Sequence, residues 1–297
     1  MQRLSWLAAT VRLLTAMLLV AATPTPDRNG ENTISVEQLG RYETLKLSGR
    51  VFHVQGLDID ANSIYVTSVD ERAHRGFVHK FTLTGNLVAV ADLTDGPRYH
   101  PGGISLQGNS LWVPVAEYRS HSTSRIIQLN AVTLNPVSSF AVADHIGAVT
   151  LNASRIYGAN WDAERIYIFD RDGRLMAKRL NPMHVAYQDL KFVGDDLIAS
   201  GIMPDRQTGA IDWLDNQSLS PRLRLEVGKT GSGQVWTREG MAIKDDKLYL
   251  LPDDGRDGAV EVYIFNLSAL KAAAAPCIPI GERDGRCISR RQVVASR

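Results

Sequence analysis

Residue types suited to acid–base catalysis or metal binding recur along this chain at similar intervals. Three histidines, His53, His100 and His145, each lie four residues before the first apolar residue of a predicted strand. A second set, two residues before the same kind of reference position, consists of Gln55, Gln188 and Glu239. Imidazole titrates near neutral pH and binds transition metals, while carboxylates and carbonyls bind calcium. If the fold brings these residues together, they form a candidate metal or acid–base site.

The spacing of these residues follows a repeat in the sequence. Five segments open with a short apolar pattern: Gln55–Ile59, Gly102–Leu106, Gly147–Leu151, Gln188–Phe192 and Glu239–Ile243. A second apolar pair follows each of them, and the third repeat resolves into four strand signals. Repeats of about 40–50 residues built from several short strands are typical of propeller blades. We therefore predict an all-β, five-bladed β-propeller over residues 35–270, with six blades as the alternative.

The fifth repeat lacks a fourth strand of its own. Val260–Phe265 alternates as a strand should, but no further strand pattern follows it. The segment Tyr42–Leu47, which precedes the first repeat, also alternates cleanly. We predict that this N-terminal strand completes the fifth blade, closing the ring and covering an exposed sheet edge.

Blade equivalence places the candidate residues on one face, around the mouth of the central channel. We predict that Glu239 and His100 act in catalysis, and that a metal ion is held by His53, His100, His145 and Glu239. The residues predicted to bind a ligand are His53, Gln55, Glu117, Arg119, His145, Asn160 and Gln188. The alternative is a structural role, because Asp, Asn, His and Gly are common at strand ends as turn and capping residues.

The loop of the second repeat is the densest in functional groups. Glu117, Tyr118, Arg119 and His121 place an acid, a ring, a cation and a base within five positions. Arg119 could bind a carboxylate or phosphate through two hydrogen bonds, or it could form a solvated salt bridge with Glu117. Trp161 could stack on a ring-shaped ligand or pack within the blade.

The first 22 residues predict a secretory signal peptide rather than part of the fold. Arg3 precedes an apolar stretch, Val20 and Ala22 suit a cleavage site, and residues 23–34 form a linker that begins with two prolines. We expect a secreted or periplasmic protein with no stable membrane span after cleavage. An uncleaved membrane anchor is the alternative.

Two cysteines, Cys277 and Cys287, lie in a C-terminal tail at residues 271–297. In an oxidising compartment, an even pair ten positions apart predicts a local disulfide that clips a loop. Two free thiols are the alternative if the protein is not exported.

Composition and motifs exclude several classes of function. The net charge is +1 and charged residues make up 22% of the chain, with no basic stripe, so we expect no nucleic-acid partner. The chain has no phosphate-binding loop, no Gly-x-Ser-x-Gly elbow and no His-Glu-x-x-His motif.

The motifs of the second repeat carry a family resemblance. Tyr99–Ile104 and Leu111–Arg119 resemble a family of exported propeller proteins that is known only as a domain of unknown function. The resemblance covers most of the chain after the leader, and it implies a propeller fold but no established activity. More distantly, the repeats are similar to the gluconolactonase/strictosidine-synthase and phytase propellers, which hold calcium in the channel. Glu239 and Asn160 match such calcium ligands by blade position, and the three histidines depart from that pattern.

The sequence thus predicts an exported propeller that binds a small polar ligand at the channel mouth. A divalent metal such as calcium or zinc would assist hydrolysis of a lactone or phosphoester. The alternative is a non-catalytic recognition or scaffold propeller with a protein partner. The residue pattern does not decide between an enzyme and a binding module.

Overall fold

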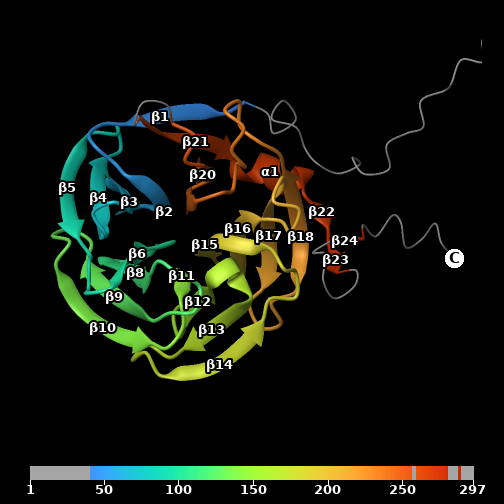
Figure 1. Ribbon diagram of the computed structural model, residues 1–297. Coiled ribbons are helices and arrows are strands. Elements are labelled where there is room, and N and C mark those ends of the chain that lie inside the picture. The colour runs from blue at the N-terminus through green and yellow to red at the C-terminus, as the bar shows by residue number, and fades with distance from the viewer. Residues whose placement is uncertain (1–40, 256–258, 280–286, 289–297) are drawn as a thin grey trace, which may run out of the picture. The chain divides into compact units, whose positions relative to one another are not determined.

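The fold is a five-bladed β-propeller made of antiparallel sheets, as the ribbon view shows (Figure 1). The computed structural model describes residues 41–255, 259–279 and 287–288. The all-β prediction and the number of blades are confirmed, and the six-bladed alternative is wrong. The predicted signal peptide, the linker and residues 35–40 lie outside the described residues.

Each blade runs from an inner strand near the axis to an outer strand at the rim. The first blade contains β2 (His53–Ile59), β3 (Ser63–Asp70), β4 (Arg75–Thr82) and β5 (Leu87–Asp92). The second contains β6 (Arg98–Pro101) and β7 (Ser105–Gln107) beside β8 (Ser110–Glu117), then β9 (Ser124–Asn130) and β10 (Pro136–Val142). The third contains β11 (Ile146–Leu151), β12 (Ile156–Asn160), β13 (Arg165–Phe169) and β14 (Leu175–Leu180), with a 3₁₀ turn η1 (Trp161–Ala163) after β12.

The last two blades each take a strand from elsewhere in the chain. The fourth contains β15 (Ala186–Val193), β16 (Asp196–Ile202), β17 (Gly209–Asp215) and β18 (Pro221–Val227), and β22 (Ala275–Pro276) adds to its edge. The fifth contains β19 (Gly240–Lys244), β20 (Lys247–Leu251), β21 (Val260–Asn266) and β1 (Glu43–Leu47). A short helix, α1 (Leu267–Ala273), connects β21 to β22.

The predicted closure of the ring is confirmed. Strand β1 pairs antiparallel with β21, from Glu43 opposite Ile264 to Leu47 opposite Val260. Leu47 is buried and packs in the same apolar cluster as Val260 and residues of the first blade. The N-terminal strand therefore links the last blade to the first and covers the edge that β21 would otherwise expose.

The predicted Cys277–Cys287 disulfide is also present. It joins the short strands β23 (Ile278–Pro279) and β24 (Cys287–Ile288) at the end of the described chain. Among the described residues, no helix is long and apolar enough to cross a membrane.

Alternation along the middle strands explains how the blades pack. In β13, Ile166 and Ile168 belong to an apolar cluster shared with the fourth blade. The intervening Tyr167 and Phe169 belong to a cluster shared with the second blade, next to Trp112. A middle strand thus has a neighbouring blade on each face, which is why its residues are apolar at nearly every position.

Near the axis, the inner strands approach so closely that only glycine fits at several positions. A Cβ atom added to Gly102 would lie 1.8 Å from the carbonyl oxygen of Gly147 in the next blade, and one added to Gly56 would lie 2.4 Å from that of Gly102. Gly103 donates a 2.8 Å hydrogen bond to the Gly147 carbonyl and accepts one of 3.0 Å from the Val149 amide. The axis between these blades is therefore filled by backbone.

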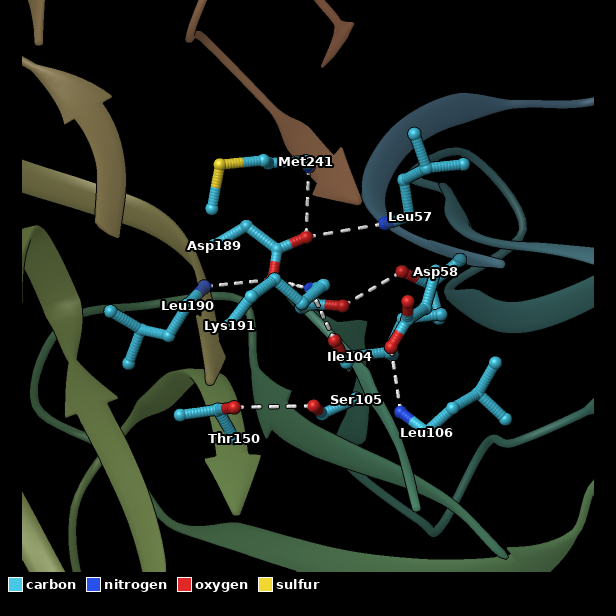
Figure 2. Close-up of polar contacts among 12 residues, drawn as sticks. Leu57, Asp58, Ile104, Ser105, Leu106, Thr150, Asp189, Leu190, Lys191 and Met241 are labelled. Carbon is cyan, nitrogen blue, oxygen red and sulfur yellow. Dashed lines mark hydrogen bonds and ion pairs between the residues drawn. The ribbon is translucent and has the colours of Figure 1, made fainter. Parts of the chain in front are cut away.

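A buried ion pair ties further inner strands together (Figure 2). Asp189 and Lys191, both on β15, are almost completely inaccessible, and their charged atoms lie 2.5 Å apart. One carboxylate oxygen of Asp189 accepts hydrogen bonds from the Leu57 amide at 3.3 Å and the Met241 amide at 3.0 Å. The ammonium of Lys191 also donates to the Ile104 carbonyl at 2.6 Å. One pair of charges thus contacts the first, second and fifth blades from the fourth.

Two more polar contacts complete this axial network. The buried carboxylate of Asp58 accepts a 2.6 Å hydrogen bond from the amide of Leu106. The hydroxyls of Ser105 and Thr150 lie 3.2 Å apart and join the second blade to the third. Buried polar groups are costly without partners, so each of these bonds helps to define one arrangement of the five inner strands.

We predict that Gly102→Ala lowers the free energy of unfolding by about 1–3 kcal/mol or more, because the added methyl group overlaps the Gly147 carbonyl. Gly147 holds the equivalent position in the third blade, but its added Cβ would meet no atom closer than 3.9 Å. Gly147→Ala is therefore the matched control and should change stability by less than about 0.5 kcal/mol. Urea denaturation measures both, and equal losses in the two variants would contradict the close axial approach.

We further predict that Asp189→Asn costs about 3–5 kcal/mol, because it leaves the Lys191 ammonium buried without its partner. The double variant Asp189→Asn/Lys191→Met removes the isolated charge and should recover part of the loss. Chemical denaturation of the wild type and the two variants measures the loss in the free energy of unfolding and the part of it that the double variant recovers. A single variant as stable as the wild type would show that the pair does not stabilise the axis.

Candidate functional site

The three repeated histidines lie at one end of the inner strands. His53 begins β2, His100 lies in β6, and His145 directly precedes β11. The ring centroids of His100 and His145 are 5.3 Å apart, and positive charge on His145 or His53 lowers the pKa of His100. The predicted gathering of these imidazoles from three blades is therefore found in the structure. Their roles in catalysis or binding stay predictions.

A small cavity opens between His100 and His145 and the third and fourth blades, and neither His53 nor Glu239 lines it. Its volume is about 100 Å³, and its lining includes five of the predicted residues: Gln55, His100, His145, Asn160 and Gln188. Gly147, Trp161, Asp162 and Tyr187 form the rest of the wall. Since one water occupies about 30 Å³ of liquid volume, the cavity has room for a few waters or for one polar group of a larger ligand.

His100 is nine-tenths buried and is held as a neutral ring. Its Nε2 lies 2.9 Å from the Oε1 atom of Gln55, an oxygen that can only accept, so Nε2 carries the proton. Its Nδ1 is buried and has no hydrogen-bond partner. Burial, together with the charges of His145 and His53, holds the pKa of His100 well below its usual value. The ring is therefore an uncharged donor to Gln55 with an unused acceptor atom.

His145 is the opposite tautomer. Its Nδ1 lies 3.0 Å from the backbone carbonyl oxygen of Arg119, so Nδ1 donates and Nε2 keeps its lone pair. Burial lowers the pKa of His145, against the effect of that hydrogen bond. The indole of Trp161 meets the imidazole edge-on, with centroids 4.7 Å apart. His145 thus offers an acceptor atom beside an aromatic wall.

His53 differs from the other two histidines because two acids, Asp253 and Glu239, flank its ring. Its Nδ1 lies 2.7 Å from a carboxylate oxygen of Asp253, and its Nε2 lies 3.9 Å from Oε1 of Glu239. Burial alone would lower the pKa of His53, but the bond to Asp253 and the charges of both acids outweigh it and raise the pKa. Asp253 therefore orients the ring so that Nε2 faces Glu239.

Glu239 is buried and shares one oxygen with Arg238, whose Nε lies 3.1 Å away. Burial raises the pKa of Glu239 to about 7, although His53 and Arg238 act in the other direction. A carboxyl with a pKa near neutrality, 3.9 Å from an imidazole, is suited to acid–base chemistry. This matches the catalytic type of residue that the sequence suggested for Glu239, and that role stays a prediction.

The four residues predicted to hold a metal are not arranged as a ligand set. Among the residues that the structure describes, no group of three or more His, Cys, Asp or Glu side chains could hold a metal ion. The histidines do not all face one space: His100 and His145 line the cavity, whereas His53 and Glu239 do not, and His53 lies between Glu239 and Asp253.

Arg119 and Glu117 form a salt bridge with each other, which was the alternative to ligand binding by Arg119. The guanidinium of Arg119 is two-thirds exposed and donates to Oε2 of Glu117 at 2.7 Å and 2.9 Å. The other oxygen of Glu117 accepts from the amide and hydroxyl of Thr123, and hydrogen bonds from Arg119 and Thr123 lower its pKa. Neither residue lines the cavity. Arg119 contributes to the site through its backbone carbonyl, which sets the tautomer of His145.

Asn160 and Gln188 do line the cavity, but Asn160 is largely occupied by structural contacts. Its side-chain oxygen accepts from the Arg165 amide at 2.7 Å, and its nitrogen donates to Asp144 at 3.1 Å. Gln188 donates a longer bond of 3.3 Å to the Ala186 carbonyl. Gln188 is therefore the freer of the two amides to contact a ligand.

Sequence reasoning missed the partners that define the site. Asp253 lies in an Asp- and Gly-rich segment, a composition typical of a turn, and it has a left-handed φ of 55°. Tyr118 was seen only as a ring, yet its centroid lies 4.1 Å from that of His100 and its hydroxyl donates to Glu71. Blade spacing offers no signal for such partners, because they come from loops without matched positions.

We predict that the stability difference between the wild type and Glu239→Gln depends on pH. The pKa of Glu239 is raised to about 7 in the folded protein, so its favourable contribution is present below about 4.5, the usual value, and is lost as pH rises through 7. Relative to Glu239→Gln, the wild type should lose on the order of 2–3 kcal/mol between pH 4.5 and 8. Thermal and urea unfolding across this range measure it, with the exposed Glu43→Gln as control. A difference that is flat with pH would contradict the buried protonated carboxyl.

Solved structures share this fold at low sequence identity. Glutaminyl cyclase from Myxococcus xanthus superposes with a TM-score of 0.56 at 12% identity, covering 75% of this chain and 95% of that one. The bifunctional GH43-CE protein from Bacteroides eggerthii gives a TM-score of 0.53 at 12% identity, covering 83% of this chain and 37% of that one. Both likenesses show the fold alone.

The sequence comparisons give a family without an activity. No curated protein matches the sequence. The model of the family of unknown function DUF6454 matches residues 41–211, which covers four of the five inner strands and the site residues from His53 to Gln188. The chain therefore belongs to the DUF6454 family of unknown function.

Proposed function

We propose that this protein binds a small hydroxylated ligand at the propeller mouth and hydrolyses a lactone or ester bond in it by general acid–base catalysis. One observation carries the proposal: the buried carboxyl of Glu239, whose pKa is raised to about 7 by burial, lies 3.9 Å from the His53 imidazole, and the charge of His53 acts on His100 in the cavity wall. The Cys277–Cys287 disulfide supports the further proposal that the protein acts after export, because disulfides persist in oxidising compartments.

The lining of the cavity favours a ligand that donates hydrogen bonds. His145 offers a lone pair on Nε2 and Gln188 offers its side-chain oxygen, whereas the unpaired Nδ1 of His100 is buried. Among the described residues, no Lys or Arg lines the cavity, and the guanidinium of Arg119 is engaged with Glu117. A phosphate group would find no cation among these residues, so a hydroxylated lactone or ester fits the site better than a phosphoester. Trp161 supplies a flat wall for the apolar face of a ring.

The acid–base pair suits the hydrolytic step. His53, oriented by Asp253, accepts a proton from water through Nε2 as the water oxygen bonds to the carbonyl carbon. The protonated Glu239 then donates its proton to the leaving oxygen as the ester C–O bond breaks. The product is a hydroxy acid, and proton exchange between His53 and Glu239, 3.9 Å apart, restores the pair. No step in this sequence requires a metal ion.

The test uses D-glucono-1,5-lactone as the probe, with acid release followed in a pH-stat against the uncatalysed rate. Glu239→Gln should lower kcat by about 10²-fold or more, the usual scale of general acid–base catalysis. Gly147→Ala should raise KM, because its methyl group enters the cavity without displacing other atoms. Glu43→Gln should behave as wild type.

Two results would count against the hydrolase. A wild-type protein that does not accelerate hydrolysis contradicts it, as does a Glu239→Gln variant with unchanged kcat. Saturable binding of hydroxylated compounds that Gly147→Ala abolishes, with no turnover in the wild type, would instead support the non-catalytic recognition propeller.

A further inference from the structure

A larger cavity lies on the face of the propeller opposite the histidines. It has a volume of about 440 Å³ and is lined by the turn that joins β11 to β12 and the turn that joins β17 to β18. The histidine cavity is lined instead by the segment after β12, at the other end of the same strands. The two cavities share no lining residue. A volume in the range of ordinary ligand pockets makes this second cavity a candidate site in its own right.

Two arginines give this cavity an uncompensated positive charge. Arg155 and Arg179 line it, and none of the described residues in its wall is acidic. Within the described part of the chain, neither guanidinium is paired with a carboxylate, and Arg179 donates only to the backbone carbonyl of Gln217. Arg75, Arg98, Arg125, Arg206 and Arg222, by contrast, each pair with an aspartate. Two guanidinium groups without a carboxylate partner in one cavity are suited to binding an anion.

The remaining wall is apolar. Tyr157 and Ile168 are buried residues of the third blade that line the cavity from below. Met176, on the outer strand β14, lines it while remaining 53% exposed. Asn216 also lines the cavity, and its side-chain amide is held by its bond to the Asp195 carbonyl. Positive charge and apolar surface in one cavity define complementary parts of one ligand.

We propose that this cavity binds a small organic anion whose acidic group pairs with Arg155 and Arg179 and whose flat apolar body packs against Tyr157, Ile168 and Met176. The acidic group is a sulfonate, phosphate or carboxylate, each of which accepts two hydrogen bonds from a guanidinium. The apolar body separates this ligand from the hydroxylated one proposed for the histidine cavity. The proposal does not depend on any activity at that cavity.

The test uses 8-anilinonaphthalene-1-sulfonate, a fluorescent aromatic sulfonate with both features. We expect saturable binding of one molecule per folded protein, measured by fluorescence and by calorimetry. The double variant Arg155→Gln/Arg179→Gln should weaken binding at least tenfold. Ala177→Leu, which keeps both arginines and fills the cavity, should weaken it as well.

The matched control is Arg72→Gln/Arg174→Gln, which removes the same charge from two exposed arginines outside the cavity. It should leave the dissociation constant within about twofold, while circular dichroism confirms that all variants fold. Absence of saturable binding to the wild type would overturn the proposal. So would binding that survives Arg155→Gln/Arg179→Gln, or that falls equally in the control, since the effect would then be one of net charge.

Discussion

The inner strands are in close contact at the propeller axis, and this contact governs both the buried charges and the channel mouth. Gly102 lies against the Gly147 carbonyl with no room for a side chain of its own, and the backbone of Gly103 bonds to the next blade. With the axis filled, charges near it lose water and need partners inside the protein. Asp189 and Lys191 satisfy each other and backbone groups of three other blades. Asp58, without such a cation in direct contact, has its pKa raised to about 6 by burial. The mouth above this core is a small cavity rather than an open tunnel.

Loss of water also changes the pKa values of the side chains at the channel mouth. Histidines that are equivalent by blade position become three different groups because their partners differ. An amide oxygen makes His100 an Nε2 donor, a backbone carbonyl makes His145 an Nδ1 donor, and two acids keep His53 prone to protonation. Burial also brings the pKa of Glu239 close to that of an imidazole. A carboxyl whose pKa lies near neutrality can take part in acid–base chemistry, and burial gives Glu239 that property.

Much of the fold follows from the sequence, because strand alternation and blade spacing are local signals. The pairing of Tyr42–Leu47 with the last blade was predictable, since an incomplete blade and an unassigned alternating strand imply each other. The gathering of His53, His100 and His145 was predictable for the same reason.

The contacts that each of these residues makes were not predictable from the sequence. Whether Arg119 bonds a ligand or Glu117, and whether Asp253 caps a turn or orients His53, depends on loop conformation that blade spacing does not encode. The Asp189–Lys191 pair was missed because alternation alone marks β15 as an inner strand and says nothing of buried charges.

Partners and burial, rather than blade position, set the state of each histidine. Nitrogen-15 NMR of the histidine rings, with assignments from single His→Gln variants, measures the tautomer and the pKa of each ring. We expect a neutral Nε2–H ring for His100, an Nδ1–H tautomer for His145 with a pKa below the usual value, and a pKa above the usual value for His53. Three rings that titrate together near their ordinary pKa, or the reverse tautomers at His100 and His145, would contradict this expectation.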